Sequence, residues 1–122
     1  MTLDFEKKDM KELRRLADAA YERELADELA KLEEEFRRWR SNEMSAFELS
    51  DRIHEFHDGA ARDLWKIYTF GRPPVAVARA IANGLIAESA LSPKLLAQLE
   101  GAIAFYRQDW VESAADDEDD DD

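Results

Sequence analysis

The chain has 122 residues, of which 45% are hydrophobic, and its formal net charge is -12 at pH 7. A chain of this length is typically one domain with a single hydrophobic core. The absence of cysteine excludes disulfides, thiolate metal sites and a cysteine nucleophile. The N-terminal residues lack a signal-peptide pattern, and the uncharged stretches are too short for a membrane span, so we expect a cytoplasmic protein.

Residues 5–40 predict one long amphipathic helix. Apolar side chains recur in this segment at steps of three and four, without an intervening glycine or proline. They are Met10, Leu13, Ala17, Tyr21, Leu25, Leu29, Leu32, Phe36 and Trp39. The helix ends in the cluster Arg37, Arg38, Trp39 and Arg40, where basic side chains stabilise the negative end of the helix dipole.

Residues 46–70 predict a second helix. Ser45 and Glu48 have the spacing of a capping box, and Met44 and Leu49 can form a hydrophobic staple. The apolar stripe that follows consists of Leu49, Ile53, Phe56, Ala60, Leu64 and Ile67. Gly71 is expected to stop this helix. Because the loop before it is short, the first two helices should form an antiparallel hairpin.

Residues 74–88 predict a third helix, which is rich in alanine and should be more buried than the first two. A fourth helix begins at Ser92 and Pro93, a cap followed by proline at the first helical position, and runs to about residue 113. Its inward residues are predicted to be Leu95, Leu99, Ala102, Ile103, Tyr106 and Trp110. Gly59, Gly84 and Gly101 fall inside the predicted helices, where we expect close helix crossings.

Residues 1–113 are therefore expected to form an all-α single domain. The fold class is a four-helix bundle-like arrangement built from two antiparallel helical hairpins. The last seven residues, DDEDDDD, are all acidic, while the rest of the chain carries a net charge of only about -5. This run cannot bury apolar surface and its charges repel one another, so we predict that residues 114–122 are disordered.

The two histidines of the chain, His54 and His57, lie in the second predicted helix. At about 100° per residue, His57 falls at the margin of the apolar stripe and His54 falls on the flank. Antiparallel pairing brings His57 to the level of Glu28, a carboxylate that interrupts the stripe of the first helix. Since buried polar groups are usually hydrogen-bonded, we predict that Glu28 and His57 pair and set the register of the hairpin.

A metal site is the alternative interpretation of these residues. Imidazole and carboxylate ligands suit zinc, iron or manganese. The ligands here would be Glu28, His54 and His57, with Asp51 or Asp58. Di-iron bundles carry a carboxylate-x-x-histidine motif on two helices, whereas this chain has it once, as Asp51 and His54. The prediction is therefore a protein without a bound metal or other cofactor.

Arg52 and His57 are separated by four residues, and this spacing resembles the arginine–histidine motif of the HEPN ribonucleases, which are small all-helical proteins. The resemblance covers these two residues and implies an RNA-cleaving site formed by Arg52 and His57. Ile53 stands where the family usually has a polar residue. The negative net charge of the chain also opposes an RNA substrate.

No phosphate-binding glycine loop, serine nucleophile elbow or nucleotide fingerprint is present, so we expect a protein without catalytic activity. We predict a small acidic interaction or regulatory module, with Arg37, Arg38, Trp39 and Arg40 as interaction residues. Tryptophan and arginine are enriched at binding hot spots, although Trp39 is also expected to close the core of the hairpin.

The expected partner is another protein, and a basic one would suit the acidic tail. A membrane or a nucleic acid is not expected, because the negative field of the chain repels a polyanion. The first helix is longer than any helix that could pair with it. A homodimer, or a structural subunit of a larger homo-oligomer, therefore stays open.

Overall fold

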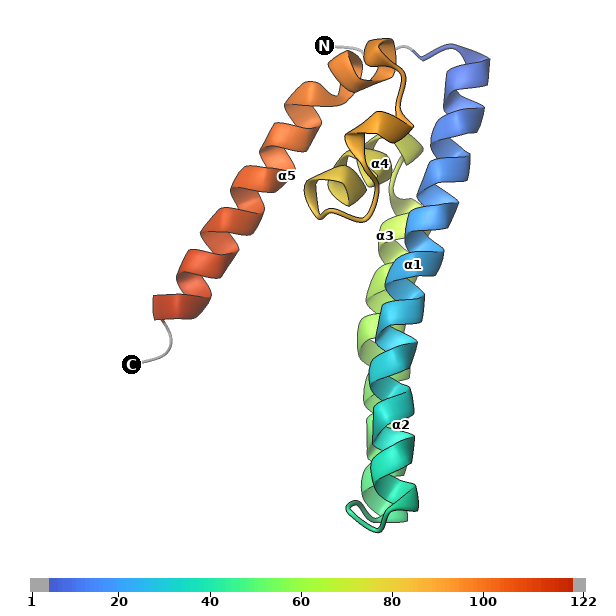
Figure 1. Cartoon of the computed structure of the whole chain (residues 1–122), viewed down its shortest axis with the longest axis vertical. Coiled ribbons are helices and arrows are strands. Elements are labelled where there is room, and N and C mark those ends of the chain that lie inside the picture. Colours follow the sequence, from blue (N-terminus) through green and yellow to red (C-terminus); the bar gives the residue numbers. More distant parts are fainter. Residues whose placement is uncertain (1–4, 120–122) are drawn as a thin grey trace. The chain divides into compact units, whose positions relative to one another are not determined.

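The structure is a computed structural model that describes the backbone of residues 5–119 and the side chains of residues 5–108. This part of the chain is helical and contains no strand, which confirms the predicted all-α fold. The elements in chain order are α1 (Lys7–Arg40), α2 (Ala46–Phe56), η1 (His57–Ala61), α3 (Arg62–Phe70), α4 (Pro73–Ala82), η2 (Glu88–Ala90) and α5 (Pro93–Asp119) (Figure 1). Within the described residues, no helix combines the length and the apolar composition that crossing a membrane requires.

The predicted end of the first helix at Arg40 is confirmed. Asn42 adopts a left-handed conformation, with φ of 61°. Its N–H donates to the carbonyl of Trp39 at 3.1 Å, and the N–H of Glu43 donates to the carbonyl of Arg38 at 2.9 Å. This pair of bonds is a Schellman motif, which satisfies carbonyl groups that the end of a helix leaves open.

The start of the second helix is also confirmed. Ser45 is the N-cap of α2, and its hydroxyl oxygen accepts a hydrogen bond from the backbone N–H of Glu48 at 3.1 Å. Met44 and Leu49 are both buried, as the predicted staple requires. The prediction of one uninterrupted α-helix was wrong in one respect, because residues His57–Ala61 form a turn of π-helix between α2 and α3.

The glycines do not mark close helix crossings. A Cβ atom added at Gly59 or Gly101 would meet nothing within 4 Å, so that interpretation is corrected. Gly84 lies outside α4 with φ of 78°, and the helix ends at Ala82 rather than at residue 88. The bonds from the N–H of Gly84 to Ile81 and from that of Leu85 to Ala80 form a second Schellman motif.

The chain divides into two compact units, residues 1–20 with 72–122 and residues 21–71. The first unit has a closed hydrophobic core, which includes α4 and the N-terminal part of α5. Its buried apolar residues are Leu13, Leu16, Ala17, Ala20, Ala76, Val77, Ala78, Ala80, Ile81, Leu91, Leu95, Leu99 and Ile103. The strong burial of the alanine-rich helix is as predicted. Ser92 caps α5 by accepting from the N–H of Leu95 at 3.2 Å, and Lys94 pairs with Glu6 at 3.1 Å.

The second unit is the predicted antiparallel hairpin, in which the C-terminal part of α1 lies beside α2, η1 and α3 (Figure 1). At its open end the rings of Tyr21 and Tyr68 stack, with centroids 4.8 Å apart. The Tyr68 hydroxyl donates to a carboxylate oxygen of Glu24 at 2.6 Å. We refer to residues 21–71 as the hairpin.

Helix α5 extends to Asp119, beyond its predicted end near residue 113. No glycine or proline follows Gly101, so the sequence contains no strong stop signal there. The inward position predicted for Trp110 lies outside the described side chains. The disorder predicted for residues 114–122 stays a prediction, since α5 continues to Asp119 and residues 120–122 lie outside the described part of the chain.

Candidate functional site

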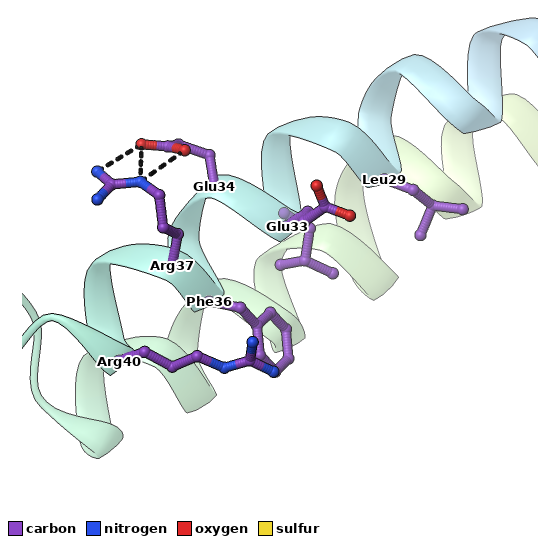
Figure 2. Close-up of a pocket in the computed structure, with 7 residues that line it drawn as sticks. Leu29, Glu33, Glu34, Phe36, Arg37 and Arg40 are labelled. Carbon is purple, nitrogen blue, oxygen red and sulfur yellow. Dashed lines mark hydrogen bonds and ion pairs between the residues drawn. The ribbon is translucent and has the colours of Figure 1, made fainter.

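One groove follows the C-terminal half of α1 and has a volume of about 610 Å³. All of its lining residues come from α1, namely Leu29, Leu32, Glu33, Glu34, Phe36, Arg37 and Arg40. In Figure 2 the guanidinium of Arg40 lies beside the ring of Phe36, while the Glu34–Arg37 ion pair lies at the opposite edge. We call this feature the α1 groove. It combines an apolar floor with charged side chains of both signs.

A second groove lies beside the π-helix and has a volume of about 400 Å³. It is lined by both arms of the hairpin, through Tyr21, Leu25, His57, Ala61, Arg62 and Trp65. Turns of π-helix inside longer helices are often found at functional sites. The indole of Trp65 packs edge-on against the ring of Phe70, with centroids 5.4 Å apart. We call this feature the η1 groove.

The two grooves belong to the same side of the hairpin. Leu25 lines the η1 groove, and Leu29, one helical turn further along α1, lines the α1 groove. On the other arm, Ile53 lies one turn before His57 and so on the same side of α2. Large apolar side chains on this side are open to solvent, with Leu29 46%, Ile53 39% and Trp65 48% exposed. We call the side formed by both grooves and Ile53 the apolar face.

The opposite flank of the hairpin is charged. A shallower groove there is lined by Glu28, Lys31, Leu32, Glu35, Arg52, Glu55, Phe56 and Ala60. The Lys31 ammonium pairs with Glu28 at 2.9 Å, and the Arg52 guanidinium pairs with Glu55 at 3.1 Å. These charges find partners on their own helices. The flank is therefore an ordinary solvated surface, in contrast to the apolar face.

Charges are ordered along the α1 groove. The acidic residues Glu33 and Glu34 come first along the helix, and Arg37 and Arg40 follow. Arg37 contacts Glu34 at 2.7 Å and Glu43 at 3.4 Å. Hydrogen bonding from Arg37 lowers the pKa of Glu34 and raises that of the arginine itself. Both members of the Glu34–Arg37 pair are thus charged at neutral pH.

The predicted interaction cluster is divided between these surfaces. Arg37 and Arg40 line the α1 groove, whereas Arg38 pairs with Glu35 at 3.3 Å. Trp39 is 40% exposed, so the expectation that it closes the hairpin core is corrected. The three arginines lie in the last turn of α1, as the dipole argument predicted.

The predicted pairing of Glu28 with His57 was wrong. The side chain of His57 is 84% exposed and its nearest charged partner is Asp58, at 3.3 Å. Glu28 accepts from Lys31 and lines the charged flank, whereas His57 lines the η1 groove. The physical reason is that Lys31, one turn along the same helix, reaches Glu28 without any burial of the histidine.

The other candidate sites are not assembled within the described residues. Glu28, His54, His57 and Asp58 do not form a group of three or more metal-ligating side chains there, nor do any other residues of that part of the chain. Arg52 pairs with Glu55 and lines the charged flank, while His57 lines the η1 groove. The two side chains of the HEPN-like spacing therefore lie on different sides of the hairpin.

Comparisons with protein-family models, with curated proteins and with solved structures found no match. Periodicity predicts Leu29 inside the hairpin stripe and gives Trp65 no role. The sequence contains one signal for the apolar face. Leu29 and Phe36 lie to one side of the line through Leu25 and Leu32, so the apolar stripe of α1 is wider than contact with one other helix requires.

Proposed function

We propose that this protein is a small non-catalytic interaction module that binds another protein chain through the apolar face of its hairpin. The observation that supports the proposal is the exposure of Leu29, Ile53 and Trp65 on one side of two helices whose other side is charged. Contiguous exposed apolar surface with a polar rim marks interaction sites in water-soluble proteins. A cytoplasmic location is part of the proposal and stays a prediction.

The energetic reason is the cost of leaving such side chains in water. Burial of a large apolar side chain contributes about 1.5–3 kcal/mol. Several half-exposed side chains on one face can therefore supply a useful share of a binding free energy. The charged rim of Glu33, Arg40 and Arg62 would restrict which partners fit, because electrostatic complementarity confers specificity.

A regulatory role for the acidic tail is a finer part of the proposal. The seven acidic residues at the C-terminus would attract a basic partner over a distance of about 8 Å at physiological salt. Removing residues 116–122 is expected to slow association and to weaken its dependence on salt. A truncated chain that bound with unchanged rate and salt dependence would remove the tail from the proposal.

The first experiment is native mass spectrometry of the full chain, purified from its own host without chelator. The expected spectrum shows the chain bound to a second polypeptide in a fixed ratio. Leu29→Gln and Trp65→Gln should each reduce the bound fraction, because a polar group then replaces apolar contact surface. Phe105→Gln is the matched control, since Phe105 is 63% exposed and lies outside the hairpin.

Circular dichroism of each variant verifies that the helices are retained. Wild-type protein that runs as a bare single chain under all conditions would contradict the proposal. So would a complex that is weakened equally by the Phe105 control and by the two variants of the apolar face. A single chain carrying a stoichiometric metal ion would instead favour the metal site with His54 and His57.

A further inference from the structure

We propose that the partner of the apolar face is a second copy of this chain, whose α1 lies antiparallel across the first, so that two hairpins form a four-helix bundle. This inference rests on the proposed function and names the occupant of the same surface. It gives the acidic tail no part in the contact, because the tails of two copies carry like charge and repel each other. Three features of the hairpin support it: its lack of a closed core, the size of the face and the order of charges along α1.

The first feature is the incomplete core. In the hairpin only Met44, Leu49 and Leu64 are buried apolar residues. Two helices form a single layer, and a stable domain needs at least two layers around one core. A second hairpin stacked on the apolar face supplies the missing layer and gives the four-helix arrangement that encloses side chains such as Leu29.

The second feature is the size of the face. The part of α1 in the hairpin runs from Tyr21 to Arg40, which is about 30 Å long at 1.5 Å per residue. Two helices side by side are about 20 Å wide. Such a face is on the scale of the roughly 800 Å² that each partner contributes to a standard interface. A short peptide would leave much of the face open.

The third feature is the charge order along the side of α1 that carries Leu29. Glu22 is exposed and lies two turns before Leu29 on the same side of the helix, and Arg40 lies three turns after it. The acidic end of the face is thus at the start of the hairpin segment and the basic end is at its finish. Glu22 and Arg40 are equally far along the helix from position 31, which is close to the middle of residues 21–40.

An antiparallel copy is therefore complementary to the first in charge and in length. When the two segments overlap completely, Glu22 of each copy faces Arg40 of the other, and the apolar residues Leu29 and Phe36 are covered. A two-fold axis produces this contact twice from one surface. In helical bundles the charges that flank the apolar seam set partner choice and orientation.

The charges of the face do not select a strongly basic partner. Around the two grooves and along the same side of α1, acidic and basic side chains are equal in number. The acidic ones are Glu22, Glu33 and Glu34, and the basic ones are Arg37, Arg40 and Arg62. A face of mixed sign fits a partner of mixed sign. The chain itself provides such a partner at equal concentration.

The test is a pair of charge reversals in the full chain, Glu22→Arg and Arg40→Glu. Sedimentation velocity of the wild type at about 1–100 μM is expected to show a dimer. This concentration range covers the dissociation constants of the weaker interfaces of standard size. Each single reversal places like charges opposite one another at both ends of the interface and should weaken the dimer about tenfold. An equimolar mixture of the two variants should dimerise as the wild type does, because in the mixed dimer one end keeps the wild-type ion pair and the other end has an ion pair of inverted sign.

Matched controls carry the same changes of charge elsewhere on α1. Asp27→Arg lies on the outer side of the helix, and Lys31→Glu lies on the charged flank, so neither should weaken the dimer. A wild type that stays monomeric throughout this concentration range would overturn the inference. So would a dimer that ignores both reversals, or two variants that fail to restore each other on mixing.

The failure of this inference is distinguishable from that of the proposed function. A chain that binds a different polypeptide, in a complex weakened by Leu29→Gln but not by the charge reversals, would overturn the second copy and retain the interaction module. A dimer that forms and resists both Leu29→Gln and Trp65→Gln would overturn both, because its interface would lie outside the apolar face.

Discussion

The two units of this chain differ in what their helices enclose. Of the buried apolar residues in the described part of the chain, all but Met44, Leu49 and Leu64 belong to the unit of residues 1–20 and 72–122. The large exposed apolar residues show the reverse distribution, since among the side chains that the structure describes only Phe105 is of this kind outside the hairpin. One unit has thus completed its core, while the other presents apolar surface that a further chain can cover.

The difference follows from the number of layers and from side-chain size. In the first unit, the small residues of α4, such as Ala78 and Ala80, allow neighbouring elements to approach closely and leave little void. In the hairpin, the two arms contact each other along one stripe only. Bulky residues beside that stripe, such as Leu29 and Trp65, have no third element of the hairpin to pack against.

The largest effect should come from a cavity in the closed core. Leu99 is buried, so Leu99→Ala should lower the free energy of unfolding by about 2–5 kcal/mol. Leu29→Ala is the matched change on the half-exposed face of the hairpin and should cost only about 1 kcal/mol. Urea unfolding followed by circular dichroism measures both, at a protein concentration where the chain is monomeric. Equal costs would break the comparison between a closed and an open unit.

The next effect concerns two glycines outside the hairpin. Gly84 has φ of 78°, where an alanine Cβ is strained, so Gly84→Ala should destabilise by about 1–2 kcal/mol. Gly101 lies within α5 with open space around its Cα, so Gly101→Ala should stabilise by about 0.5–1 kcal/mol. Thermal unfolding decides the signs. Stabilisation by Gly84→Ala would show that α4 does not end in the left-handed turn.

Helix caps provide a smaller effect that separates the units. Ser45→Ala removes the cap of α2 in the hairpin, and Ser92→Ala removes the cap of α5 in the other unit. Each should cost about 1 kcal/mol, because a backbone N–H loses its acceptor. Hydrogen exchange should place the lost protection in the unit that carries the change. Loss of protection in the other unit instead would contradict the division into two units.

The smallest effect is expected for the exposed ion pair of the α1 groove. Arg37 lowers the pKa of Glu34, so the contribution of this pair to stability is present above the ordinary carboxyl pKa and is lost as the pH falls through the lowered value. Because both side chains are open to solvent, Glu34→Gln should leave the unfolding midpoint at pH 7 unchanged within error. A clear loss of stability in Glu34→Gln at pH 7 would indicate that this edge of the α1 groove is covered.

Local signals accounted for most element boundaries. The end of α1 at Arg40, the cap at Ser45 and the start of α5 at Pro93 were all predictable, because each depends on a few adjacent residues. Gly84 was misplaced inside a helix although the pair Asn83 and Gly84 is typical of a helix end. The signal for this helix end was therefore present in the sequence.

The candidate site was less predictable. Periodicity identified Leu29 and Phe36 as members of an apolar stripe but could not tell which members the second arm would cover. Trp65 received no role because it lies off the stripe of the second predicted helix. The misplaced partner of Glu28 has the same origin, since a helical wheel shows which residues share a side and not which neighbour reaches them first.

The amino-acid sequence by itself determined the helical class, the hairpin and the caps, because hydrophobic period, glycine, proline and capping side chains act over a few residues. Only the tertiary structure decided that the core closes around α4 and α5, that the hairpin keeps an apolar face, and that His57 points to solvent. The physical reason is that burial depends on how many layers meet at a side chain, and that number is a property of the packed chain.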